Sequence, residues 1–291
     1  MKSSILLHRV AALCLISAAH SAVNGASAQS APRSSAATAD AGSGLSYADL
    51  ADLADGAALV AQARVIRVTP LPPEQAGGVT PGYRRLYVEA QVIGLIRGDG
   101  GISPAVAYLY DAPVDSRGKL PRLKKAQVIL FARPGARPGQ IQLVARDAQI
   151  AATPATLATV KSVLADLVAN GAPPRITGVG DAFHVAGTVA GESETQIFLR
   201  TQQGDPVSLS ILRRPGEPPR WAVALGEIVD EAAKVPMRGG LLWYRLTCSL
   251  PQELPARSVR TLSVQEAEAA RADYRFVIQS LGPCDRTRAA G

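Results

Sequence analysis

The chain has 291 residues, of which 47% are hydrophobic, 19% charged and only 4% aromatic, and its formal net charge is +7. This composition excludes a fibrous or intrinsically disordered protein, and the length favours two domains over a single core. The charge is mild, so it favours solubility and weak attraction to anionic surfaces but indicates no specific partner.

The N-terminus has the pattern of a secretory signal peptide, which we assign to residues 1–28. Lys2 and Arg9 give a positive start, residues 10–23 are mostly apolar, and Ala28 completes an A-x-A cleavage site. An uncleaved anchor is the alternative, but the apolar run is shorter than a membrane-spanning helix requires. We therefore expect cleavage after Ala28, a periplasmic or secreted protein, and no transmembrane segment in the mature chain. Without its two basic residues, 29 Lys and Arg remain against 24 Asp and Glu, a net charge of +5.

Cleavage leaves two cysteines, Cys248 and Cys284, in the mature chain. Two cysteines in an exported protein predict one disulfide, worth roughly 4 kcal/mol on the chain-entropy account. Two free thiols or a metal-binding pair are the alternatives. A zinc site needs three or four ligands, so we expect no metal and no cofactor.

Residues 29–44 are rich in Ala and Ser and predict a disordered leader. Ser46 is typical of a helix N-cap and has Asp49 three residues later, which predicts a short helix over Tyr47–Ala54. Alternating apolar residues separated by turn-forming segments then predict five strands. These are Ala58–Val68, Tyr83–Gly98, Ala105–Asp111, Gln127–Arg133 and Ile141–Ile150. Five short strands of this kind suit a small closed barrel.

The clearest alternation lies in Tyr83–Gly98. Five apolar residues recur on one side of this strand: Leu86, Val88, Ala90, Val92 and Ile96. This period of two predicts a half-buried strand, and Gly94 on the same side predicts a bend or bulge.

The clearest helix starts at Thr153-Pro154 and ends before Asn170-Gly171. We place a domain boundary after it, so that residues 45–171 form one domain and residues 172–291 a second.

The second domain is predicted to mix strands with short helices. The expected strands are Phe183–Val189, Thr195–Gln202, Val207–Arg214, Trp221–Leu225 and Leu241–Leu250, with a helical turn at Glu227–Ala233. A capping box at Ser263–Glu266 starts a final helix that ends at Leu281. Cys284 is then expected to join this end of the chain to the strand that carries Trp243. The predicted fold class is β-rich α+β, with an OB-like five-stranded barrel and flanking helices, then a smaller α+β domain closed by a C-terminal helix.

A family resemblance rests on three segments of the first half. Leu59–Val65, Gly94–Gly98 and Val128–Phe131, together with the preceding helix, are similar to the secreted netrin-type modules. The resemblance covers residues 45–170 and implies a five-stranded OB barrel with terminal helices. The metalloproteinase inhibitors of that family act through an N-terminal cysteine, which this half lacks after cleavage, so only the fold is implied. As a whole the chain resembles an exported protein of a Gram-negative bacterium.

The catalytic candidates are grouped around His184, the one histidine left after cleavage. Ser193, or the pair Glu192 and Glu194, could act with it in a hydrolase, because both lie nearby in sequence. No serine sits in a G-x-S-x-G elbow, and a strand histidine that makes an ordinary hydrogen bond is the competing interpretation.

The binding candidates are basic and aromatic residues of the predicted barrel: Arg85, Tyr87, Lys119, Arg122, Lys124 and Lys125. OB barrels bind strands of nucleic acid with such groups. Export, the mild charge and the few aromatic residues argue against nucleic acid, and an anionic envelope surface is the simpler partner.

The sequence therefore favours an exported, non-catalytic protein that binds another macromolecule, either an unknown protein or an anionic envelope component. A hydrolase based on His184 and a structural component of the cell envelope are the alternatives.

Overall fold

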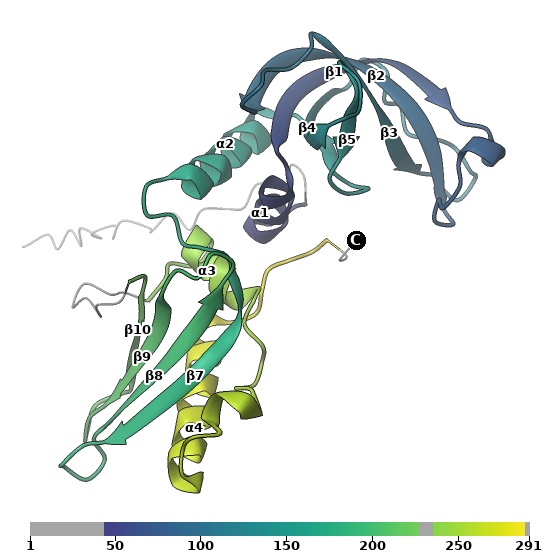
Figure 1. The fold of residues 1–291 in the computed structure, drawn as a ribbon. Helices are drawn as coiled ribbons and strands as arrows, with labels where there is room; N and C mark the ends of the chain where they lie inside the picture. The colour runs from purple at the N-terminus through teal and green to yellow at the C-terminus, as the bar shows by residue number, and fades with distance from the viewer. Residues whose placement is uncertain (1–43, 227–234, 289–291) are drawn as a thin grey trace, which may run out of the picture. The chain divides into compact units, whose positions relative to one another are not determined.

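Two antiparallel sheets form the framework of the computed structural model, which describes residues 44–226 and 235–288 (Figure 1). All of these residues belong to one compact unit, Asp40–Gly291. The predicted signal peptide (1–28), the leader up to residue 43 and the turn predicted at Glu227–Ala233 lie outside the described residues.

The first sheet curves into a nearly closed barrel. Its elements, with their neighbouring helices, are α1 (Tyr47–Gly56), β1 (Leu59–Pro70), η1 (Pro73–Gln75), β2 (Tyr83–Arg97), β3 (Ala105–Pro113), β4 (Gln127–Pro134), β5 (Ile141–Leu143), β6 (Gln149–Ala151) and α2 (Pro154–Val168). The strand order is β3-β2-β1-β4-β5, and β6 pairs with β4 beside β5. The predicted barrel with a helix on either side of it in sequence is confirmed.

The alternation predicted for Tyr83–Gly98 is present in β2. Leu86, Val88 and Ala90 are buried inside the barrel. The pairing of β2 with β1 skips one residue on either side of Gly94, at Ile93 and at Ile96. This irregularity matches the bulge expected at Gly94, since an unpaired residue bends a strand.

Strand β4 separates two hydrophobic clusters. Val128 and Leu130 point into the barrel, whereas Ile129 and Phe131 join a second cluster that also contains α1, α2 and the inner face of the second sheet. Burial on both faces explains why this strand is an unbroken apolar run.

The single fifth strand predicted at Ile141–Ile150 is wrong. It is divided into β5 and β6, and the chain between them loops away from β4. Phe131 holds both ends of the loop, because its carbonyl accepts a hydrogen bond from Val144 and its amide donates to Ala148. The alternating pattern therefore continues in sequence across a segment that is not a strand.

The second sheet has the order β10-β9-β8-β7. Its strands and the helices that follow are β7 (Ile176–Ala186), β8 (Ser193–Thr201), β9 (Val207–Arg213), β10 (Arg220–Ala224), α3 (Leu241–Thr247), η2 (Ala256–Val259) and α4 (Val264–Leu281). Strand β7 begins seven residues before the predicted Phe183–Val189. The first half of β7 lacks a regular alternating pattern in the sequence, because it contains Gly178 and its pairing with β8 is irregular between Val179 and Ala182.

The strand predicted at Leu241–Leu250 is also wrong, because residues 241–247 form helix α3. Gly240 is its N-cap residue, and its carbonyl accepts the first backbone hydrogen bond from Tyr244. Nearly every side of this short helix is buried, so its sequence shows no helical period that could distinguish it from a buried strand.

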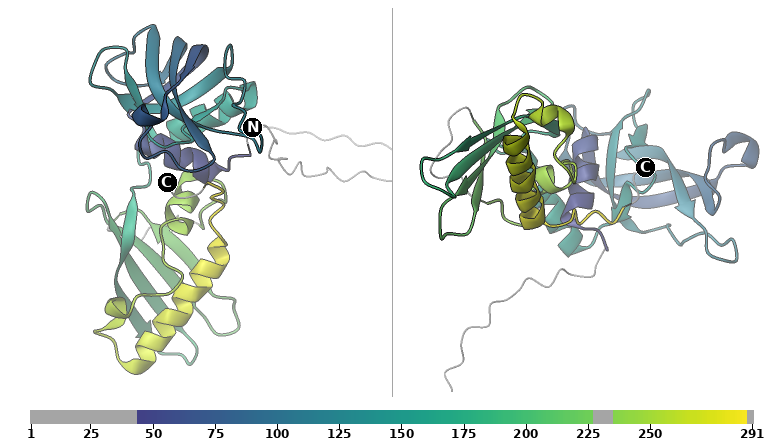
Figure 2. Two further views of the ribbon diagram at one scale, coloured as in Figure 1. Left: turned by 90° about the vertical axis from the view of Figure 1, so that its right-hand side faces the viewer. Right: turned by 90° about the horizontal axis from the view of Figure 1, so that it is seen from below.

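Helix α4 covers one face of the second sheet, as the two views of Figure 2 show. The capping box predicted at its start is present, with Ser263 Oγ accepting from the Glu266 amide. Ala270, Tyr274 and Val277 form its buried side. The predicted disulfide between Cys248 and Cys284 is present and joins the end of α3 to the segment after α4.

Among the described residues, none of the helices combines the length and apolar character that crossing a membrane requires.

The disulfide yields the first prediction. Changing both Cys248 and Cys284 to Ser should lower the free energy of unfolding by about 4 kcal/mol, because the open chain gains the entropy of a loop of 36 residues. Urea unfolding of the two proteins measures this difference. Reductant should destabilise the wild-type protein alone, and an equal effect on the double-serine variant would contradict the assignment.

Candidate functional site

An open groove of about 680 Å³ lies on the outside of the barrel where β3 approaches β5. Its walls come from the outward-facing residues of β2 and β3 and from the segment 135–146. This volume is in the range of ordinary ligand-binding pockets. Two of the binding candidates named from the sequence, Arg85 and Tyr87, lie in its lining.

The polar part of the groove is built around Arg85. Its guanidinium donates two parallel hydrogen bonds to the Asp111 carboxylate, 2.7 and 2.8 Å long, and a third to the carbonyl of Gly77. The hydrogen bond to the Asp111 side chain is the main reason that the pKa of Arg85 is raised, and desolvation opposes this effect only in part. Because Arg85 and Asp111 face each other across the β2–β3 ladder, this pair fixes the floor of the groove.

A second arginine, Arg146, borders the groove. It donates a 2.7 Å hydrogen bond to Thr80 Oγ1, and its guanidinium lies 5.2 Å from the centre of the Tyr83 ring. No salt bridge joins Arg146 to a carboxylate within the described residues. Arg146 is exposed and places a positive charge at the border of the groove.

The apolar part of the groove is centred on Leu109, whose side chain is 49% exposed. Below it, Tyr108 is buried and donates a 2.6 Å hydrogen bond to Gln149 Oε1. Burial raises the pKa of Tyr108, which keeps this phenol a donor at any ordinary pH. The groove thus offers an exposed leucine above a rigid floor.

The other four binding candidates share the loop 113–125 and are not part of the groove. Lys119, Arg122, Lys124 and Lys125 are all exposed, and none forms a salt bridge within the part of the chain that the structure describes. Lys125 has a φ of 70°, and its amide donates to the Val65 carbonyl, which anchors the end of the loop to β1.

His184 lies in a buried polar network between the second sheet and α4. Its Nδ1 is 2.8 Å from Thr195 Oγ1, and Thr195 donates its own proton to Asp273 Oδ2. Arg213 Nε donates to the other oxygen of Asp273 at 2.6 Å. Thr195 and Asp273 are fully buried, and the His184 side chain is only 9% exposed. No sequence pattern connects Thr195 with Asp273, because the two residues are 78 positions apart.

Ser193, Glu192 and Glu194 lie at the start of β8, where Ser193 pairs with Arg213 of the network across the sheet. Thr195 pairs directly with His184 across the ladder, whereas Glu194 sits on the opposite, exposed face of the sheet. All three candidates border a smaller pocket of about 380 Å³, which Arg213 also lines. No hydrogen bond between their side chains and His184 is present among the described residues.

The order of groups in the network differs from that of a serine triad. In a triad the imidazole stands between the hydroxyl and the carboxylate, and it removes the hydroxyl proton. Here the Thr195 hydroxyl stands between His184 and Asp273. The threonine has no exposed surface from which to attack a substrate. The arrangement is that of a structural network.

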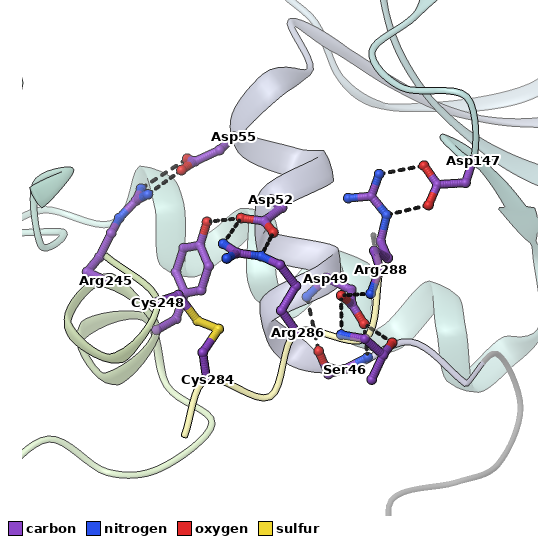
Figure 3. Close-up of polar contacts among 12 residues, drawn as sticks. Ser46, Asp49, Asp52, Asp55, Asp147, Arg245, Cys248, Cys284, Arg286 and Arg288 are labelled. Carbon is purple, nitrogen blue, oxygen red and sulfur yellow. Dashed lines mark hydrogen bonds and ion pairs between the residues drawn. A yellow bond between two sulfur atoms is a disulfide. The ribbon is translucent and has the colours of Figure 1, made fainter. Parts of the chain in front are cut away.

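A third polar cluster was not anticipated from the sequence and centres on helix α1 (Figure 3). Asp49, Asp52 and Asp55 follow one another at intervals of three residues and so project from one side of the helix. Asp55 binds Arg245 of α3, Asp52 binds Arg286, and Asp49 accepts from the segment after α4. The regular spacing of the acids in α1 was the available signal, but their partners outside the helix lie 120 to 239 residues away.

Asp49 is the most completely bonded of these acids. It accepts from the side chain and amide of Thr287, the amide of Arg288 and the amide of Ser46. Burial alone would raise the pKa of Asp49, but these hydrogen bonds together outweigh it and hold the pKa below its ordinary value. Arg288 also binds Asp147 through two hydrogen bonds, which lower the pKa of Asp147.

Within residues 44–226 and 235–288 there is no cluster of three or more His, Cys, Asp or Glu side chains suited to a metal ion. The sequence matches no protein-family model and no curated protein.

Asp49→Asn tests the cluster on α1. An amide cannot accept all four hydrogen bonds, so we expect the free energy of unfolding at pH 7 to fall by about 2 kcal/mol. Because the folded-state pKa of Asp49 is lowered, its contribution is complete above about pH 4 and is lost as the pH falls through the lowered value. The difference between wild type and variant should therefore shrink below pH 4.

Denaturant unfolding between pH 2 and 8 measures this dependence. Asp99→Asn is the matched control, because it removes the same charge from an exposed loop position. A difference that stays constant down to pH 2 would contradict the role of the Asp49 carboxylate.

The buried network gives a separate prediction. Asp273→Ala should lower the free energy of unfolding by about 3 kcal/mol, because it leaves Arg213 and the buried Thr195 without their acceptor. Asp181→Ala, at an exposed position of β7, should change it by less than about 0.5 kcal/mol. Urea unfolding measures both losses. If Asp273→Ala lowers the free energy of unfolding as little as Asp181→Ala does, the network is not important for stability.

Proposed function

We propose that this protein is a non-catalytic, exported binding protein that holds another macromolecule in the groove between β3 and β5. The observation that carries the proposal is the groove itself, with exposed Leu109 beside the fixed Arg85–Asp111 pair. A groove that combines an apolar centre with a few oriented polar groups is what binding sites commonly share.

The strand connections support an OB-type barrel. Strand β1 pairs with both β2 and β4, and β3 meets the start of β5 in a parallel bridge between Ala107 and Gln140. OB barrels bind extended polymers on the face of their second and third strands. The groove lies on the corresponding face of β2 and β3, which favours binding of a macromolecule there.

Export is the second part of the proposal. The signal-peptide pattern in residues 1–28 supports it, and a disulfide in the folded chain is compatible with an oxidising compartment such as the periplasm. A binding protein in that compartment would meet envelope proteins and anionic surfaces. The five exposed basic residues of the loop 113–125, which include Arg117 beside the four binding candidates, would favour the anionic surfaces.

The hydrolase alternative has less support. It needs His184 beside a nucleophile that a substrate can reach, whereas the hydroxyl bonded to His184 belongs to the buried Thr195. Glu194 lies on the other face of the sheet. The buried network is therefore better explained as a part of the fold.

Affinity capture from the organism that produces the protein tests the proposal. The tagged, exported protein is used to capture partners, which are identified by mass spectrometry. We expect a partner that is retained by the wild type and reduced at least tenfold with Leu109→Lys. Ile93→Lys is the matched control, because Ile93 is a comparably exposed barrel residue, at 47%, outside the groove lining.

Two outcomes decide the result. Equal capture by the wild-type and Leu109→Lys proteins would rule out the groove as the binding site. A partner lost when Lys124 and Lys125 are both changed to Glu, but kept by Leu109→Lys, would place binding on the basic loop instead.

A further inference from the structure

A second groove, of about 450 Å³, lies between helix α2 and the last residues of β2. It shares no lining residue with the groove between β3 and β5, and we call it the α2 groove. Its volume is in the range of pockets that hold small organic molecules. Nine residues form its lining: Gln62, Gly94, Leu95, Ile96, Arg97, Lys161, Leu164, Ala165 and Val168.

Helix α2 supplies one wall from a single side of its surface. Its four lining residues are spaced three or four positions apart, so they form one stripe along the helix. Val160 and Val163 are completely buried and belong to the neighbouring side, which packs on the core. Val168 lies at the end of the helix and is 68% exposed. The stripe is therefore polar at Lys161 and apolar from there to its end.

Strand β2 supplies the other wall at its bulge. Gly94 has no side chain, and apart from its chain neighbours a Cβ atom there would meet no heavy atom within 4 Å. Beside it, Leu95 is 38% exposed. The glycine that the sequence marks as a bend thus leaves this wall of the groove open.

The lining carries two positive charges and no negative one. Lys161 belongs to the α2 wall and is exposed, and Arg97 belongs to the β2 wall. Arg97 donates a 3.0 Å hydrogen bond to the Ala54 carbonyl, which fixes its guanidinium. The α2 groove therefore combines exposed apolar side chains with a positive potential. This combination is complementary to a molecule that has both an acyl chain and an anionic group.

We propose that the α2 groove binds one anionic lipid with a single acyl chain. The head group contacts Lys161, Arg97 adds to the positive potential, and the chain lies along the groove towards Val168. A protein partner fits less well, because a stable protein interface takes about 20 residues or more from each side, against nine here. A carboxylate and a phosphate head group share this chemistry. The proposal is independent of the proposed function, which concerns the other groove.

Isothermal titration calorimetry of the intact exported protein tests the proposal. The probes are dodecanoate and dodecyl phosphate, both below the concentrations at which they form micelles. We expect one bound molecule per chain, and the tighter of the two probes identifies the head group. Dodecyltrimethylammonium, with the same chain and the opposite charge, should bind at least tenfold more weakly. Removal of two methylene groups from the tighter probe should weaken binding about fourfold, as expected for half-buried methylenes.

Two variants test the α2 wall. Lys161→Glu reverses the charge at the head group, and Val168→Glu places an acid in the apolar part of the groove. Each should weaken binding of the tighter probe at least tenfold. Both side chains are exposed, so the variants should fold as the wild type does, and circular dichroism checks this. Lys124→Glu, at an exposed lysine outside the lining, is the matched control and should leave binding unchanged.

Gly94→Leu tests the β2 wall. Because a Cβ atom has space there, the leucine should be accepted by the fold and occupy the groove. We expect binding at least tenfold weaker. Gly100→Leu, at another glycine with open space around it, is the control and should bind as the wild type does. Equal binding by the two variants would overturn the placement of the chain against β2.

A photoreactive dodecanoate, with a diazirine near the end of its chain, locates the site without any variant. Crosslinks identified by mass spectrometry should lie within residues 94–97 and 161–168. Crosslinks confined to the groove between β3 and β5 would overturn the site. The lipid class is wrong if neither anionic probe binds, if dodecyltrimethylammonium binds equally well, or if Lys161→Glu binds as tightly as Lys124→Glu.

Discussion

The rest of the structure depends on the acidic side of helix α1. A charge buried in a protein is costly unless it is paired and hydrogen-bonded, and this helix supplies the partners for several cations at once. Arg245 is only 8% exposed and is bound by Asp55, while Asp52 accepts from both Tyr244 and Arg286. The helix is itself fixed on its other side, where Leu50 and Leu53 enter the larger hydrophobic cluster. One helix of ten residues therefore holds together segments that come from both ends of the described chain.

The polar groups of the molecule divide into two kinds. The cluster on α1 and the network around Asp273 are satisfied internally, with nearly every donor and acceptor used, and such networks make a structure rigid and unique. The groove between β3 and β5 is different, because Leu109 and Arg146 in its lining are exposed to solvent.

Local patterns allowed much of the fold to be predicted. The capping residues Ser46 and Ser263 mark the starts of two helices, and the alternation in β2 identifies the side chains that point into the barrel. Both signals depend only on residues that are close in sequence. Helix α3 was mistaken for a strand, since a short segment buried on all sides carries no period. The partnership of Thr195 with Asp273 could not be predicted, because it is created by the packing of α4 on the sheet. For the groove between β3 and β5, Arg85 and Tyr87 can be identified from the pattern of their strand. Leu109 and Arg146 can be recognised only from the folded structure, because the fold brings their segments together.

The pairing of Asp49 with Thr287 has a consequence for the order of biosynthesis. These residues are separated by 238 positions, and α1 leaves the ribosome long before its partners have been made. During that interval the acidic side of the helix and the facing part of the larger cluster have no native partner. The acidic side of α1 therefore acquires its native partners only after residues 286–288 have been synthesised.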